Sequence, residues 1–287
     1  MASKLSVVGL GRMGSALAST LLKNDNDVTV WNRTESKTRP LLAAGASQAS
    51  SAADAIAASD ITIICVGNYD DSRNIFSDCR DLAGKTLIQL TTGTAAEAEA
   101  MQEWAISKDG LYLDGVIAAY PSGIGSDETL LVVAGSERAW EISEEFIKCL
   151  GGASMHVGTD LSAPIALESA MIGPSLMAIV GMIQGAYLLE QAGLDVGLYA
   201  EMMGSATPLL AESLHRQAMA IATNSFTDTE ASLGTWAAGL NHNADAYGEQ
   251  AGIDLFKPIR ELLNRAVNAG YGEEEVAAAI KIFREAG

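Results

Sequence analysis

The sequence has few cysteines and few histidines, and both are scattered. Its three cysteines, Cys65, Cys79 and Cys149, are odd in number and widely spaced, so they form neither a disulfide framework nor a CxxC metal motif. The three histidines, at positions 156, 215 and 242, lack the spacing of zinc ligands. A disulfide-rich secreted domain and a metal site are therefore not expected.

Positive charge is also scarce. The chain has 18 Lys and Arg against 36 Asp and Glu, a net charge of −18. Nucleic acids and anionic membranes bind basic surfaces, so neither is an expected partner. The acidity is compatible with a cationic substrate, but plain solubility is the simpler interpretation. The first residues run directly into an apolar strand without a signal peptide, which predicts a cytoplasmic protein.

The chain has enough apolar residues for one large or two modest domains. It has 287 residues, 48% hydrophobic and 19% charged. Apolar runs typical of strands alternate with alanine-rich helical stretches in the first half. We expect strands at 5–8, 27–31, 61–65, 86–90, 111–116 and 130–134, and helices at 15–23, 52–58, 72–79, 95–107 and 137–150. This alternation predicts an α/β domain with a mainly parallel sheet covered on both faces.

A glycine motif follows the first predicted strand and opens the first helix. It reads Gly9-Leu10-Gly11-Arg12-Met13-Gly14. A GxGxxG motif alone is weak evidence for dinucleotide binding, but this one lies between a strand and a helix, which is the position that such binding requires. Gly9 permits the tight turn, Gly11 lets the backbone approach a pyrophosphate, and Gly14 lets the helix pack on the sheet. A purely structural glycine turn is the alternative.

The second predicted strand ends in cations and polar residues. An NAD site places Asp or Glu here, about 20 residues after the glycines, to bind the ribose 2′-hydroxyl. This chain has Asn32, Arg33 and Thr34, with Lys37 one turn later. A guanidinium binds a 2′-phosphate with two parallel hydrogen bonds. We therefore predict NADP(H) as the cofactor, although surface cations without a role are the alternative.

Two further strand ends are predicted to reach the cofactor. Ligands of such sheets bind beyond the carboxyl ends of the strands. Val66, Gly67 and Asn68 follow one strand, and Thr92 and Gly93 follow the next. The threonines of this stretch, Thr91, Thr92 and Thr94, are equally well explained as caps of the following helix.

A long apolar helix is expected at 163–193. Between Glu168 and Glu190 lie 21 residues without charge. That length would span a membrane, but a helix apolar all round is also typical of a buried position in a large or oligomeric protein. Pro174, Ser175 and Gln184 favour the buried helix, covered by a partner chain, over a membrane span. Helices are then expected at 198–222, 230–250, 253–269 and 273–285.

The chain resembles the imine reductase and reductive aminase family of the β-hydroxyacid dehydrogenase superfamily. The resemblance covers nearly the whole chain and is carried by Gly9–Gly14, Val30–Thr34, Leu90–Thr94, Asp114–Gly125, Gly158–Asp160 and Ser232–Gly239. It implies NADPH-dependent reduction of an imine or iminium carbon–nitrogen double bond. It also implies a Rossmann domain at 1–162, an inter-domain helix at 163–193 and an all-α dimerisation domain at 194–287. Such enzymes are intertwined homodimers with active sites between subunits.

Two positions depart from the family pattern. Ser169 aligns with the catalytic Lys of the dehydrogenases and with the Asp or Tyr of many imine reductases. A serine hydroxyl is a much weaker acid than those side chains. Met177 stands where a second Tyr is frequent. An iminium ion needs only a hydride, so the site can work without a strong acid. Some family members that lack it act on bulky bisindole-like substrates, and this chain resembles that branch.

The remaining candidates lie outside the cofactor motif. Tyr120 is a second candidate proton donor, acting through water. Met177, Trp236, Ser122 and His242 are candidates for the substrate pocket. The alternatives are core packing for Met177, dimer packing for Trp236 and a structural role for His242. Two other functions stay open: a β-hydroxyacid dehydrogenase, which the absent lysine disfavours, and a catalytically silent NADPH-binding protein.

Overall fold

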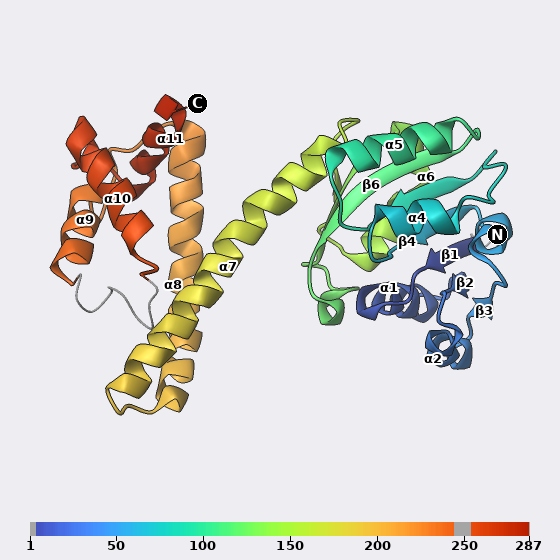
Figure 1. Ribbon diagram of the computed structural model, residues 1–287, viewed down its shortest axis with the longest axis horizontal. Coiled ribbons are helices and arrows are strands. Elements are labelled where there is room, and N and C mark those ends of the chain that lie inside the picture. Colours follow the sequence, from blue (N-terminus) through green and yellow to red (C-terminus); the bar gives the residue numbers. More distant parts are fainter. Residues whose placement is uncertain (1–3, 244–253, 287) are drawn as a thin grey trace. The chain divides into compact units, whose positions relative to one another are not determined.

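The computed structural model describes residues 4–243 and 254–286. The chain forms two compact units, residues 1–175 and 176–287, which we call the N-terminal and C-terminal units. Figure 1 shows the elements of each unit. The boundary falls inside one helix, α7 (Ser162–Gln191), so each unit is described by itself.

The N-terminal unit contains an eight-stranded sheet in the order β3-β2-β1-β4-β5-β6-β7-β8. Every pairing is parallel except β6 with β7, so the sheet is mainly parallel, as predicted. Strands β3 and β8 were missed because two residues are too few to show a pattern. The strands are β1 (Lys4–Val8), β2 (Asp27–Trp31), β3 (Ser47–Gln48), β4 (Ile61–Ile64), β5 (Thr86–Gln89), β6 (Leu111–Ala118), β7 (Leu130–Gly135) and β8 (Met155–His156).

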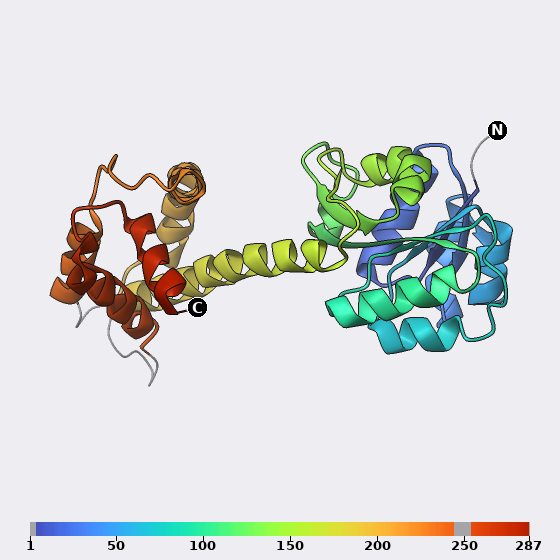
Figure 2. The same ribbon diagram turned by 90° about the horizontal axis from the view of Figure 1, so that it is seen from above.

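Helices cover both faces of this sheet (Figure 2). They are α1 (Arg12–Lys23), α2 (Arg39–Ala43), α3 (Ala52–Ala58), α4 (Tyr69–Ile75), α5 (Ala95–Ile106) and α6 (Glu137–Leu150), with single 3₁₀ turns at Glu35–Lys37 and Pro121–Gly123. Helix α4 begins three residues before the predicted helix. The reason is that Asn68 caps it, with its side chain accepting a hydrogen bond from the Asp71 N–H at 2.7 Å.

The sheet buries both faces, which explains why central strands such as β4 and β7 are predominantly apolar rather than alternating. On one face, side chains such as Val7 and Ile63 pack with α1 and α6. On the other, their neighbours Val8 and Ile64 pack with α3, α4 and α5. All four side chains are fully buried. The strands therefore have well-defined carboxyl ends, at which the candidate site lies.

The C-terminal unit is helical in the part that the structure describes, apart from one isolated bridge between Ser232 and Glu275. Its core contains Phe226, Leu233, Leu263 and Ile282. The predicted helix at 230–250 begins later, and its residues 244–250 lie outside the described residues. The elements are α8 (Val196–Thr223), α9 (Leu233–His242), α10 (Lys257–Ala266), α11 (Ile280–Ala286), a π-helical turn at Val267–Tyr271 and a 3₁₀ turn at Val276–Ala279.

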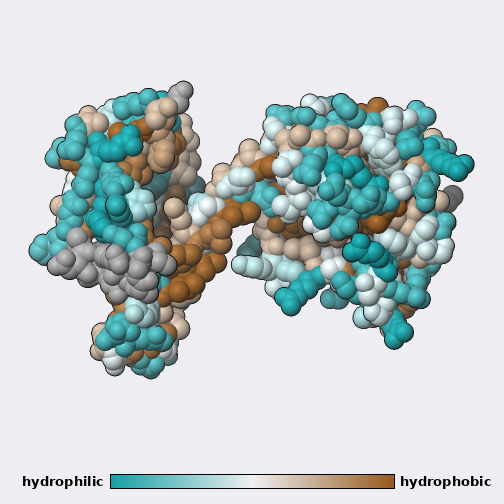
Figure 3. Space-filling model, viewed as in Figure 1, coloured by the Kyte–Doolittle hydropathy of each residue, from teal (hydrophilic) through white to brown (hydrophobic). Residues whose placement is uncertain are grey.

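Helix α7 carries apolar side chains on its outer surface. It is 30 residues long and contains Pro174. Leu176, Met177 and Ile183 are 55%, 73% and 57% exposed, and hydrophobic residues line the helix in Figure 3. The helix is long and apolar enough to cross a membrane, which is weak evidence because core helices of soluble proteins pass the same test. Its expected cover by a partner chain stays a prediction.

A buried carboxyl on β6 joins this strand to the start of α4. Asp114 of β6 is 2% exposed and accepts hydrogen bonds from the hydroxyls of Tyr69, at the start of α4, and Tyr112, at 2.7 Å. The Tyr69 ring in turn lies under Gly93, where an added Cβ would come within 2.3 Å of it. Burial raises the pKa of Asp114 to about 6, although the two tyrosine hydrogen bonds oppose the shift.

This carboxyl predicts a pH dependence of stability. Because the native pKa of about 6 exceeds the ordinary 3.8, the native state binds more protons than the unfolded state between those values. The contribution of Asp114 to the free energy of unfolding is therefore fully present below pH 4. It is lost as the pH rises through 6, and the loss amounts to about 3 kcal/mol. Urea unfolding of wild type and Asp114→Asn at pH 4 and pH 7 tests it. Equal pH dependence in both proteins would contradict it.

Candidate cofactor and substrate site

The turn after β1 requires glycine at two of its three motif positions. Gly9 has φ +94°, and a Cβ there would lie 2.3 Å from the Cys65 carbonyl oxygen. A Cβ on Gly14 would lie 1.9 Å from the Gly9 carbonyl oxygen. Gly11, in contrast, has no atom within 4 Å of its Cβ position. The open side of Gly11 leaves room for a ligand to approach the backbone.

The turn delivers the positive end of helix α1 to the same place. Its first intrahelical bond runs from the Ser15 N–H to the Gly11 oxygen at 3.0 Å. The N–H groups of Arg12, Met13 and Gly14 precede that bond, and the first turn contains no acidic residue. Such a helix start binds phosphate groups.

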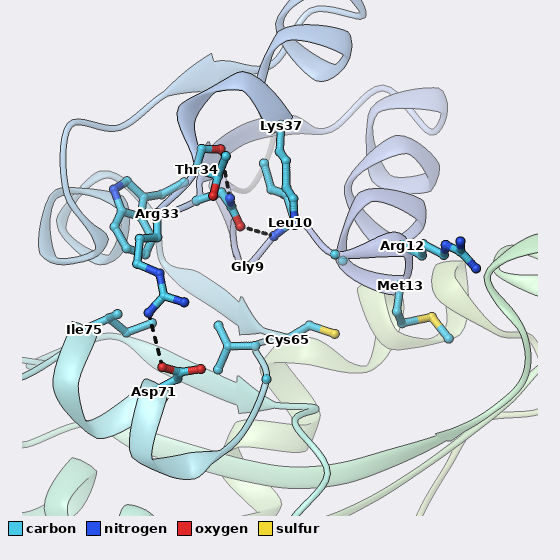
Figure 4. Close-up of a pocket in the computed structure, with 16 residues that line it drawn as sticks. Gly9, Leu10, Arg12, Met13, Arg33, Thr34, Lys37, Cys65, Asp71 and Ile75 are labelled. Atoms are coloured by element: carbon cyan, nitrogen blue, oxygen red, sulfur yellow. Dashed lines mark hydrogen bonds and ion pairs between the residues drawn. The ribbon is translucent and has the colours of Figure 1, made fainter.

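A cavity of about 420 Å³ surrounds this turn (Figure 4). Asn32 connects the glycine turn to the segment after β2. Its side chain accepts a hydrogen bond from the Leu10 N–H at 2.8 Å and donates one to the Thr34 oxygen at 2.9 Å. The lining contains most of the predicted cofactor residues and four that were not predicted. The predicted ones are Gly9, Leu10, Gly11, Arg12, Met13, Gly14, Asn32, Arg33, Thr34, Lys37, Val66 and Gly67, and the others are Trp31, Cys65, Asp71 and Ile75.

Arg33 and Lys37 supply the positive charge at the end of β2. The Arg33 side chain is 79% exposed and lies at the opening of the cavity. Because a carboxylate at this strand end would repel a 2′-phosphate and a guanidinium attracts it, the geometry fits NADP(H).

Arg33→Ala is expected to raise the Kd for NADPH about 10- to 100-fold, because a charge-assisted hydrogen bond is worth about 1.5–3 kcal/mol. The Kd for NADH, which lacks the phosphate, is expected to change little. Fluorescence titration of each nucleotide measures both constants. Arg138→Ala, at a comparably exposed arginine on α6, is the control. An equal loss for both nucleotides would contradict the assignment of Arg33.

A second cavity, of about 210 Å³, continues from the first along the strand ends. The two share Met13, Cys65, Val66 and Gly67. Beyond these, it is lined by Leu90, Thr92, Gly115, Val116, Ile117 and Glu168. Burial raises the pKa of the Cys65 thiol to about 11, so Cys65 contributes a neutral wall rather than a nucleophile.

Glu168 is the residue that the sequence reasoning missed. It lies on α7 within the N-terminal unit, one position before Ser169, and lines the second cavity beside Thr92 and Val116. A signal was available, because Glu168 is the charge that precedes the apolar run of the helix. Adjacent helical positions point about 100° apart, so a shift of one residue changes which side chain faces the sheet.

The other predicted residues lie elsewhere. Asn68 caps α4 and Gly93 packs on the Tyr69 ring, and neither lines the two cavities. Tyr120 is 77% exposed, and Ser122 and Ser169 are also exposed. The roles of Tyr120, Ser122 and Ser169 stay predictions.

In the C-terminal unit, Trp236 lines a separate cavity of about 310 Å³ together with Thr235, Leu240 and three other residues. It is 51% exposed there. His242 is exposed at the end of α9, and Met177 is exposed on α7. Their assignment to a substrate pocket stays a prediction.

Family models match both halves of the chain. Residues 4–158 match the NAD binding domain of 6-phosphogluconate dehydrogenase. Residues 160–285 match the C-terminal domain of NADPH-dependent reductive aminase-like proteins.

Full-length relatives agree with both matches. An NADPH-dependent reductive aminase of Aspergillus oryzae is 30% identical over 99% of this chain and 98% of that protein. An imine reductase from Myxococcus stipitatus, solved with NADP+, is 32% identical with a TM-score of 0.88, over 97% of this chain and 99% of the other. A reductive aminase from Aspergillus terreus, solved with NADPH4, cyclohexanone and allyl amine, is 27% identical with a TM-score of 0.87. This match covers 99% of this chain and 100% of the other.

The fold and these matches define an NADP-dependent oxidoreductase with a Rossmann domain and a helical C-terminal domain, with the cavity beside the glycine turn as its candidate cofactor site. Within that class, the chain belongs to the family of NADPH-dependent reductive aminases and imine reductases. The expectations for fold class, family and cofactor are thereby confirmed.

Proposed function

We propose that this protein reduces the carbon–nitrogen double bond of an imine or iminium ion with NADPH. The observation that carries the proposal is the continuous edge from Arg33, at the phosphate end, to Glu168, at the far end. When bound, NADPH supplies the hydride. The chain itself holds the phosphates with the glycine turn and α1, and presents one carboxyl at the other end of the sheet edge.

Glu168 suits a nitrogen substrate. Its carboxylate attracts a protonated imine or an iminium cation, and its acid form can donate a proton to a neutral imine nitrogen. Leu90, Val116 and Ile117 form apolar walls around it, and a less polar surrounding strengthens such an attraction. The acid that the family pattern requires is thus supplied by Glu168 in place of Ser169.

The same carboxylate disfavours the β-hydroxyacid dehydrogenase alternative. A hydroxyacid carries a carboxylate, which Glu168 would repel, and no lysine is among the residues that line the second cavity in the described part of the chain. The bulky bisindole-like substrate stays a prediction. Because Glu168 supplies an acid, the absence of an acid at position 169 is no longer a reason to restrict the substrate to that class.

NADPH oxidation, followed by absorbance with three substrate groups, tests the function. Cyclic imines and aryl iminium ions are expected to be reduced, and hydroxyacids with NADP+ are expected to be inert. Hydroxyacid oxidation would overturn the proposal. Tight NADPH binding without turnover of any imine would support the catalytically silent alternative.

We further propose a cytoplasmic homodimer in which a second copy covers α7. Its exposed apolar residues include neighbours in sequence, such as Leu176 and Met177, as well as Ile179, Val180 and Ile183. They therefore point in several directions around the helix, and a partner must wrap it rather than rest on one face. Apolar patches of this extent on a soluble chain mark an interaction surface.

Ile183→Glu is expected to dissociate the dimer, because a charge would be buried in an apolar interface at a cost of several kcal/mol. Sedimentation should give twice the chain mass of 29.9 kDa for the wild type and the single mass for the variant. Ile106→Glu is the matched control, since Ile106 is 59% exposed against 57% for Ile183 but lies on α5. A monomeric wild type would contradict the homodimer.

A further inference from the structure

Helix α4 places a carboxylate in the cofactor cavity opposite the cations of β2. Asp71 is in the first turn of α4, and its N–H is fixed by the Asn68 cap at 2.7 Å. Its Oδ2 lies 3.1 Å from the Cβ position of Gly67. Ile75, one turn later, lines the same cavity. This face of α4 therefore forms one wall, and the Arg33 side forms another.

Arg33 reaches across the cavity to this carboxylate (Figure 4). The Arg33 Nη1 and the Asp71 Oδ1 are 3.4 Å apart, with side chains 79% and 34% exposed. An ion pair that long and that exposed is weak, so the guanidinium can reorient at little cost. The carboxylate has less freedom, because its short side chain stands on a capped helix. Its negative charge stays in the cavity wherever the guanidinium points.

We propose that Asp71 is a selectivity-determining residue that limits the preference of this protein for NADPH over NADH. A 2′-phosphate carries a charge of about −2, and it must bind Arg33 in competition with the Asp71 carboxylate. Two anions bound to one guanidinium lie within the Debye length of about 8 Å, close enough to repel each other. The neutral 2′-hydroxyl of NADH meets no such repulsion. Asp71 therefore weakens the binding of one cofactor and not of the other.

The proposal depends on the NADP(H) site and not on imine reduction. Its test therefore measures binding without any substrate, by fluorescence titration of NADPH and NADH. Asp71→Asn keeps the size of the side chain and removes its charge. We expect the Kd for NADPH to fall about tenfold and the Kd for NADH to change less than twofold, with the NADPH effect shrinking in 1 M salt.

Asp70→Asn is the matched control. Asp70 is the preceding residue on α4, its side chain is 77% exposed and paired with Arg73, and it does not line the cavity. A tenfold effect of Asp70→Asn would mean that only the net charge of the protein matters, and would overturn the proposal. An unchanged or increased Kd for NADPH in Asp71→Asn would also overturn it.

A double-mutant cycle with Arg33→Ala identifies the route of the effect. If the carboxylate competes for the guanidinium, Asp71→Asn should tighten NADPH binding less in the Arg33→Ala background than in the wild type. If Asp71→Asn still tightened NADPH binding tenfold in the Arg33→Ala background, competition for the guanidinium would be contradicted. Asp71→Ser, which keeps a polar side chain at the start of the helix, is a second neutral variant should Asp71→Asn fold poorly, and thermal unfolding shows whether each variant is folded.

Discussion

Glu168→Gln is expected to lower kcat for neutral imines about 100- to 1000-fold, within the range of general acid catalysis. The amide keeps the shape of the side chain but can neither donate a carboxyl proton nor attract a cation through a full charge. The Kd for NADPH should stay unchanged, because Glu168 lies at the far end of the site from the glycine turn. Steady-state rates and nucleotide titration give the two quantities separately.

Two comparisons sharpen this test. Glu190→Gln makes the same chemical change at the other end of the charge-free part of α7, where Glu190 is exposed, and should leave kcat unchanged. A preformed N-alkyl iminium needs no proton, so Glu168→Gln should reduce its turnover less than that of neutral imines. If Ser169→Ala abolished turnover and Glu168→Gln did not, the catalytic role would return to Ser169.

Gly14→Ala is expected to remove NADPH binding and to destabilise the N-terminal unit by about 3 kcal/mol, at the upper end of the cost of overpacking. The added Cβ would lie 1.9 Å from the Gly9 carbonyl oxygen. The oxygen belongs to the backbone, and the backbone also fixes the position of the Cβ atom, so rotating a side chain cannot relieve the contact and α1 must move away from the glycine turn. Thermal unfolding and NADPH titration measure the two effects.

Gly11→Ala separates ligand approach from folding. Its Cβ position has no atom within 4 Å, so the stability should change by less than about 1 kcal/mol, the cost of an ordinary glycine substitution. The Kd for NADPH should nevertheless rise about tenfold or more, because the methyl group occupies the side from which a pyrophosphate approaches. A Gly11→Ala protein that binds NADPH normally would contradict this position for the phosphates.

Local patterns predicted the part of the site that lies within short stretches of chain. The glycine turn, the cations after β2 and the Thr94 cap of α5 depend on neighbours a few residues away, and the structure has them as expected. Cys65, Asp71 and Ile75 could not be assigned that way. They line the first cavity because the parallel pairing of β1 with β4 brings the start of α4 beside the glycine turn.

The apolar pattern, the glycine spacing and the cations after β2 were sufficient for the α/β domain and the cofactor, because each depends on residue types at short separations, and the resemblance of short motifs to known proteins added the family. Tertiary structure alone decided which helical position faces the sheet edge, Glu168 or Ser169, and which carboxylate stands opposite Arg33. Those are questions of direction across tens of residues. One helical step turns a side chain by about 100°, and only packing of the helix against the strands sets that direction.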